Sequence, residues 1–145
     1  QGPKWLGGKL AYLWAVLYTV FTYRSPFVRV SIDGEVLEGK FLNIIMAKGV
    51  YYGGGIHVAP EARLDSGVFE VFVLNDMSIA TALWYLPRFY NGTFVEVEAL
   101  VLRYQASSIT AESNERVVLD LDGEAPGQLP VTVDLLPGAL NLLVP

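Results

Sequence analysis

Several residue types that carry common chemistry are absent or scarce in this chain. Its 145 residues include no cysteine, which excludes disulfides, thiolate metal sites and cysteine nucleophiles. This absence fits an intracellular protein, so we expect a cytoplasmic location. The single histidine, His57, excludes a zinc site built from several imidazoles of this chain. No Gly-x-Ser-x-Gly sequence occurs, so a serine hydrolase triad is not supported either.

Charge is also scarce. Charged residues make up 17% of the chain, the formal net charge is −5, and no basic cluster occurs. This balance argues against a nucleic-acid partner. Apolar residues reach 52%, which is high for a free-standing domain. We therefore expect part of the surface to pack against something else.

The N-terminal segment is predicted to be a long helix from about Leu6 to Tyr23, apolar nearly all round. Only 14 uncharged residues separate Lys9 from Arg24, fewer than the roughly 20 that span a bilayer. The helix could be buried in the core of this domain. It could instead be covered by another domain, by lipid in a peripheral membrane contact, or by a second copy of the chain in a homo-oligomer.

The remaining pattern predicts a mainly β fold of one domain covering residues 1–145. About eight strands follow one another in hairpins, which favours an antiparallel β-sandwich or barrel. One short helix is expected from Ile79 to Tyr90, capped by Ser78 and ended by Asn91-Gly92. A strand is expected over 94–104. The strand residues expected in the core are Val71, Val73, Val97, Leu119, Leu121, Val131 and Val133.

An acidic hairpin follows in the segment from Val117 to Pro126. Apolar and polar residues alternate up to Asp122-Gly123, a strong turn signal because glycine accepts a positive φ. The turn is flanked by two carboxylates, Asp122 and Glu124. A solvated hairpin tip is one interpretation and a functional acid pair is the other. Composition alone does not exclude a glycosidase with two opposed carboxylates.

Five short motifs occur in an order that resembles a known family. They are Tyr52-Gly-Gly-Gly, Ala59-Pro60-Glu61-Ala62, Leu64-Asp65-Ser66-Gly67, Asp122-Gly123-Glu124 and Leu136-Pro137-Gly138-Ala139-Leu140. Together they resemble the C-terminal half of the diacylglycerol kinase-like lipid kinases, which include bacterial lipid kinases and sphingosine kinases. The resemblance extends over essentially the whole chain.

The resemblance implies the two-domain architecture that these enzymes share with NAD kinases. In the family an N-terminal α/β domain carries a Gly-Gly-Asp-Gly-Thr nucleotide motif, and a β-rich C-terminal domain supplies the lipid pocket. No Gly-Gly-Asp-Gly-Thr occurs here. We therefore expect this chain to be the lipid-substrate domain, with the N-terminal nucleotide-binding domain as its partner.

The resemblance also implies a reaction and assigns residues to it. ATP, held with Mg²⁺ mainly by the other domain, would phosphorylate a lipid hydroxyl such as that of diacylglycerol. Glu124 matches the family glutamate that takes the hydroxyl proton, and Asp122 matches the flanking aspartate. The 145-residue chain alone is expected to be inactive. The alternatives are a non-catalytic β-sandwich that binds lipid or protein and, third, an NAD kinase, to which the apolar first helix is less suited.

A metal loop is the last implication of the resemblance. Bacterial relatives hold a structural Mg²⁺ in the loop that matches 63–68, and the matching positions are Arg63, Ser66 and Val68. The family's Asp-Asp-Gly reads Asp65-Ser66-Gly67 here. A hydroxyl is a poorer ligand than a carboxylate for a hard dication. Since Asp65 is expected to point the other way, we expect a weak or absent ion.

Overall fold

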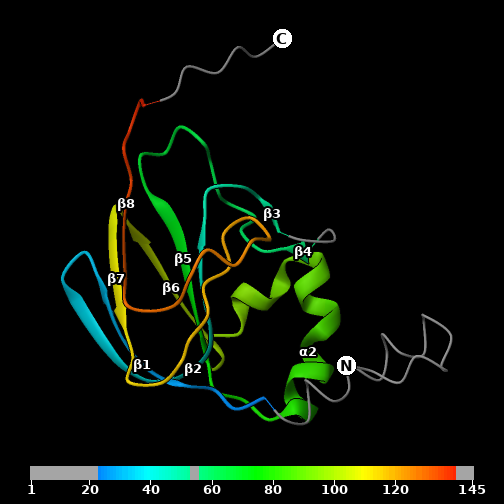
Figure 1. Cartoon of the computed structure of the whole chain (residues 1–145). Helices are drawn as coiled ribbons and strands as arrows, with labels where there is room; N and C mark the ends of the chain where they lie inside the picture. The colour runs from blue at the N-terminus through cyan, green and yellow to red at the C-terminus, as the bar shows by residue number, and fades with distance from the viewer. Residues whose placement is uncertain (1–22, 53–55, 140–145) are drawn as a thin grey trace, which may run out of the picture.

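The computed structural model describes residues 23–52 and 56–139, and this part of the chain is mainly β (Figure 1). Apart from Tyr23, the predicted N-terminal helix lies outside the described residues. The elements in chain order are β1 (Phe27–Ile32), β2 (Glu35–Ala47), β3 (Tyr51–Tyr52), β4 (Ile56–His57), β5 (Phe69–Asn75), helix α2 (Ile79–Asn91), the 3₁₀ helix η1 (Thr93–Glu96), β6 (Val101–Ala106), β7 (Ser108–Glu112) and β8 (Val131–Asp134).

Six strands form one antiparallel sheet in the order β6-β5-β2-β1-β7-β8, and β3 and β4 form a separate hairpin. Strand β2 changes partner along its length. Its first half, Glu35 to Lys40, pairs with β1, and its second half, Phe41 to Ala47, pairs with β5 after a bulge near Phe41. Only Ser107 separates β6 from β7, so this segment likewise passes from β5 to β1. Strands that exchange partners at a bulge or bend form the corners of folded sheets. The sheet therefore curls round, and the antiparallel prediction is confirmed.

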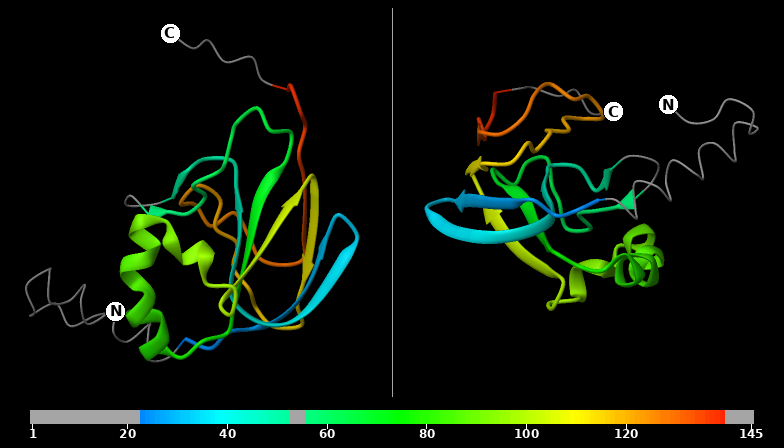
Figure 2. Two further views of the ribbon diagram at one scale, coloured as in Figure 1. Left: turned by 180° about the vertical axis from the view of Figure 1, so that it is seen from behind. Right: turned by 60° about the horizontal axis from the view of Figure 1, so that its bottom comes forward.

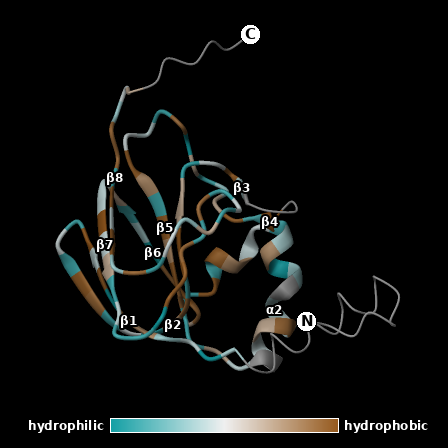
Figure 3. Ribbon diagram, in the orientation of Figure 1, coloured by the Kyte–Doolittle hydropathy of each residue, from teal (hydrophilic) through white to brown (hydrophobic). Residues whose placement is uncertain are grey.

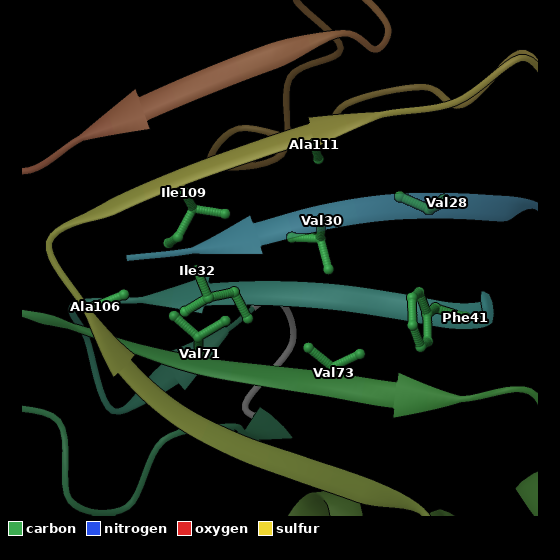
Figure 4. Packing of buried hydrophobic residues seen from close by; sticks show 9 residues of the cluster. All are labelled: Val28, Val30, Ile32, Phe41, Val71, Val73, Ala106, Ile109 and Ala111. Carbon is green, nitrogen blue, oxygen red and sulfur yellow. The ribbon is translucent and has the colours of Figure 1, made fainter. Parts of the chain in front are cut away.

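The main core lies inside this curl (Figure 4). Strand β1 contributes Val30 and strand β5 contributes Val71 and Val73, all three with no exposed surface. Because successive side chains of a strand point to opposite faces, alternate residues of each strand reach this core. Its buried members are Val28, Val30, Ile32, Phe41, Val71, Val73, Ala106, Ile109 and Ala111.

A second core lies on the other face of β5, under α2 and η1 (Figure 2). Phe72 and Leu74 point to this side, so β5 is buried on both faces. Phe89 of α2 stacks on Phe94 of η1, with ring centroids 4.5 Å apart. The other buried members are Ala47, Val58, Ala59 and Val101.

Helix α2 has the predicted caps. Ser78 accepts a hydrogen bond from the backbone N–H of Thr81, and Gly92 ends the helix with φ of 77°. Pro87 lies inside the helix without ending it. Hydrophobic and hydrophilic residues both occur along α2 (Figure 3). Two of its hydrophobic side chains, Leu83 and Trp84, are exposed. Within 23–52 and 56–139, no helix is both long and apolar enough to cross a bilayer.

Two sequence predictions need correction. The strand expected over 94–104 begins only at Val101, because Gly92 turns the chain and η1 directs Phe94 into the second core. Val71 and Val73 are buried as predicted, but Val97, Leu119, Val131 and Val133 are only half-buried. Leu121 is 65% exposed, and its hairpin is not part of the six-stranded sheet.

Candidate functional site

The acidic hairpin is part of the connection between β7 and β8, drawn in orange in Figure 1. Asp122 has φ of 52° and Gly123 φ of 88°. Leu121 and Glu124 exchange two backbone hydrogen bonds of 2.8 and 3.0 Å across this turn. Two residues of positive φ closed by such a pair form the tight turn that suits a β-hairpin. The turn predicted at Asp122-Gly123 is confirmed.

The arms of this hairpin are less regular than the predicted strand. They pair at two isolated bridges, Val118 with Gln128 and Leu121 with Glu124. Two residues lie between the bridges on the first arm and three on the returning arm, so the returning arm holds one extra residue. Pro126, which has no N–H to donate, lies in this irregular stretch. The base of the hairpin, at Val117 and Leu129, packs against the main core.

The tip of the hairpin presents its carboxylates to solvent. The Asp120 carboxylate accepts a 2.9 Å hydrogen bond from the backbone N–H of Gly123, which ties the turn to the first arm. Asp122 and Glu124 are exposed, and Leu121, opposite Glu124, is exposed as well. The backbone of Glu124 is thus fixed by its bonds to Leu121, while its side chain is accessible.

The loop before β5 brings together Arg63, Ser66 and Val68, the three positions that the sequence resemblance predicts for a metal site. The Ser66 hydroxyl oxygen lies 3.0 Å from the carbonyl oxygen of Arg63 and 3.0 Å from that of Val68. The backbone N–H of Ser66 also bonds to the Arg63 carbonyl, at 3.3 Å. Three oxygens therefore converge in one tight loop.

The fourth member of this cluster is Lys48, which the sequence analysis missed. The Lys48 ammonium donates to the Ser66 hydroxyl at 2.9 Å and to the Val68 carbonyl at 2.8 Å. Lys48 directly follows β2, and 18 residues separate it in number from Ser66. No local sequence pattern links the two positions. The one signal in the sequence is that Lys48 directly follows an apolar strand.

Asp65 is directed toward Arg63 instead of the cluster of oxygens. The Arg63 guanidinium donates two 3.1 Å hydrogen bonds to the Asp65 carboxylate, and both side chains are largely exposed. These bonds, and the positive charge of Arg63, hold the pKa of the Asp65 carboxyl below its usual value. Asp65 is therefore engaged with Arg63.

These residues do not fit a divalent cation. The converging donors are two carbonyls and a hydroxyl, with no carboxylate among them, whereas Mg²⁺ and Ca²⁺ sites in proteins draw on carboxylate oxygens. The Lys48 ammonium bonds to two of the same three oxygens and would repel a dication there. The expectation of a weak or absent ion stays a prediction, now with a physical cause.

Comparison with known proteins gives a consistent picture. The family described as "YegS C-terminal NAD kinase beta sandwich-like domain" matches residues 1–144. Over 143 residues the chain is 25% identical to a "Putative lipid kinase" of Staphylococcus epidermidis and 22% identical to one of Staphylococcus aureus. Each match covers 99% of this chain and 47% of the relative, so the chain spans about half the length of these curated relatives.

Solved structures share the fold. The crystal structure of a "putative diacylglycerol kinase" from Bacillus anthracis matches with a TM-score of 0.66 and 26% identity. The match covers 92% of this chain and 47% of that one.

Proposed function

We propose that this chain, which belongs to the family of YegS C-terminal NAD kinase beta sandwich-like domains, is the lipid-substrate domain of an ATP-dependent lipid kinase. The reaction would transfer the γ-phosphoryl group of ATP to a lipid hydroxyl such as that of diacylglycerol. The observation that carries the proposal is the acidic turn, in which Glu124 is held on an exposed hairpin by two backbone bonds to Leu121. Relatives named as lipid kinases over the same segment support it.

In this proposal Glu124 acts as the general base. As the lipid oxygen attacks the γ-phosphorus, the hydroxyl proton passes to a carboxylate oxygen of Glu124, and the bond to ADP breaks. Phosphoryl transfer depends mostly on positioning, so a base fixed by a hydrogen-bonded turn is better suited than one on a free loop. ATP would donate the phosphoryl group, and its Mg²⁺ would neutralise the phosphate charge. Both would be held mainly by the nucleotide-binding domain.

The partner surfaces follow from what the hairpin and α2 expose. Val118 and Leu121 are 56% and 65% exposed beside the acidic turn, a surface that a nucleotide-binding domain could cover. Leu83 and Trp84 of α2 are 52% and 80% exposed, which supports a peripheral contact with a lipid surface. The lipid substrate would then reach Glu124 at the boundary between the two domains.

The test is Glu124→Gln in the full-length kinase. This change keeps the size of the side chain and removes its basicity. We expect kcat to fall on the order of 10²–10⁴-fold, the usual contribution of a general base, while ATP and lipid binding stay nearly unchanged. Glu98→Gln, at an exposed position in another loop, is the matched control and should keep full turnover.

The alternative is a non-catalytic β-sandwich that binds lipid or protein. It predicts that the wild-type protein transfers no phosphate to lipid. If the full-length protein is a lipid kinase but Glu124→Gln keeps wild-type turnover, the base assignment is wrong. That outcome would remove Glu124 from the mechanism, and Asp122 would be the next carboxylate to test.

A further inference from the structure

The three oxygens of Arg63, Ser66 and Val68 form a small cation cradle, and the Lys48 ammonium takes part in its hydrogen bonds. The Ser66 hydroxyl accepts from the Lys48 ammonium at 2.9 Å and, more weakly, from the Val68 N–H at 3.4 Å. Its single proton then goes to the carbonyl of Arg63 or of Val68, each 3.0 Å away. The second Lys48 proton goes to the Val68 carbonyl at 2.8 Å. The ammonium therefore completes the cradle.

The charge balance of the cradle suits one positive charge and not two. All three oxygens are uncharged, and the Lys48 ammonium donates charge-assisted hydrogen bonds to two of them. A dication needs negative ligands to offset its loss of hydration. The adjacent carboxylate, Asp65, is held by Arg63. Nothing in the cradle itself would compensate a second charge.

We propose that Lys48 is a built-in replacement for a structural divalent cation in this loop. In this exchange, Ser66 supplies no carboxylate for a metal ion, and the ammonium of Lys48 takes the place of that ion. The inference concerns the fold of this domain and does not depend on the proposed kinase activity.

The exchange has a structural role. Lys48 follows the last residue of β2, and Val68 directly precedes β5. Strands β2 and β5 are neighbours, paired from Ala47 with Glu70 onward. The ammonium thus ties the end of one strand to the start of the next, and no metal is needed to order the loop. Lys48 is thus a positioning residue for this loop.

Thermal unfolding of the full chain, without nucleotide, tests the proposal in EDTA and in millimolar MgCl₂ or CaCl₂. The wild type should unfold at the same temperature in all three solutions. Lys48→Met keeps the aliphatic stem and removes the ammonium, and should lower Tm by roughly 3–8 °C. Lys40→Met, an exposed lysine on β2, is the matched control and should change Tm little.

The decisive variant is Lys48→Met combined with Ser66→Asp, which restores a carboxylate and vacates the ammonium position. Its Tm should be low in EDTA and recover with Mg²⁺ or Ca²⁺. If neither Mg²⁺ nor Ca²⁺ raises the Tm of the double variant, the proposed exchange is wrong. So would calorimetric binding of Mg²⁺ or Ca²⁺ to wild-type protein in this loop, abolished by Ser66→Ala, a measurement that requires no destabilised variant.

Discussion

The Asp33 carboxylate lies 2.8 Å from the backbone nitrogen of Ser108, 75 residues further along the chain. Asp33 is in the turn between β1 and β2, and Ser108 begins β7 just after the bend. The same carboxylate also accepts from the backbone N–H of Ser107 at 3.0 Å and from its hydroxyl at 3.2 Å. One side chain therefore holds the turn of one hairpin against the corner of the curled sheet.

This contact predicts a pH-dependent contribution to stability. Hydrogen bonds from the backbone of Ser107 and then of Ser108 lower the pKa of the Asp33 carboxyl in the folded protein. A group with a lowered folded pKa stabilises the fold fully above its unfolded pKa, about 3.9. That contribution disappears as the pH falls from there toward the lower folded pKa.

Chemical unfolding of the wild type and Asp33→Asn across pH 2–7, a range of about five units around that pKa, would measure the effect. We expect the wild type to be the more stable at neutral pH and the difference to shrink below about pH 4. Ser107→Ala removes only the hydroxyl donor and should keep most of the pH dependence. A difference that is constant over the whole range would contradict the assignment.

Gly92 is expected to resist substitution for two separable reasons. Its φ of 77° disfavours any residue with a Cβ, and a Cβ there would lie 2.7 Å from Nδ1 of His57. Gly92→Ala should destabilise the fold by about 1–3 kcal/mol, measured by denaturant unfolding. Gly138→Ala, with φ of 69° but open space around the Cβ, reports the backbone cost alone. Equal losses in the two variants would mean that the His57 contact adds nothing.

Asp122 is expected to matter through its backbone as much as its charge. Asn tolerates the φ of 52°, so Asp122→Asn should keep the turn and reduce kcat of the full-length kinase less than Glu124→Gln does. Asp122→Val places a β-branched residue at this φ and should distort the turn and reduce kcat, although residue 124 is still a glutamate. Steady-state kinetics on both variants decide, and full activity of Asp122→Val would show that the turn geometry does not position the base.

The 145-residue chain by itself is expected to show no specific ATP binding and no lipid phosphorylation, because the proposed nucleotide site lies in another domain. Titration calorimetry with Mg·ATP measures the first and radiolabelled phosphate transfer to diacylglycerol the second. Saturable ATP binding to the chain alone, weakened by substitutions on its own surface, would contradict the proposal that the nucleotide site lies in another domain.

Local signals explain which elements the sequence could predict. Ser78 and Asn91-Gly92 mark the two ends of α2, and each is where the pattern places it. The alternation from Phe94 to Val97 also looks local but leads to the wrong element. There the burial of Phe94 against Phe89 and Phe72 outweighs the strand preference of the sequence.

The candidate site shows the same division. The grouping of Arg63, Ser66 and Val68 is implied by the resemblance to a known family. The turn at Asp122-Gly123 could be predicted because two adjacent residues specify it. Lys48 could not, since its bonds cross 18 and 20 residues and depend on how β2 and β5 pair.

The acidic hairpin leaves the sheet from β7 and rejoins it at β8, and these two strands pair through only four residue pairs, from Ala111 with Val131 to Ser108 with Asp134. The position of the hairpin tip therefore depends on this short ladder and on the packing of Val117 and Leu129 against the main core. A shift of β8 would move the base of the hairpin, and Glu124 with it. Substitutions at Thr110 or Thr132, whose hydroxyls lie 3.1 Å apart across the ladder, should thus alter kcat of the proposed kinase reaction.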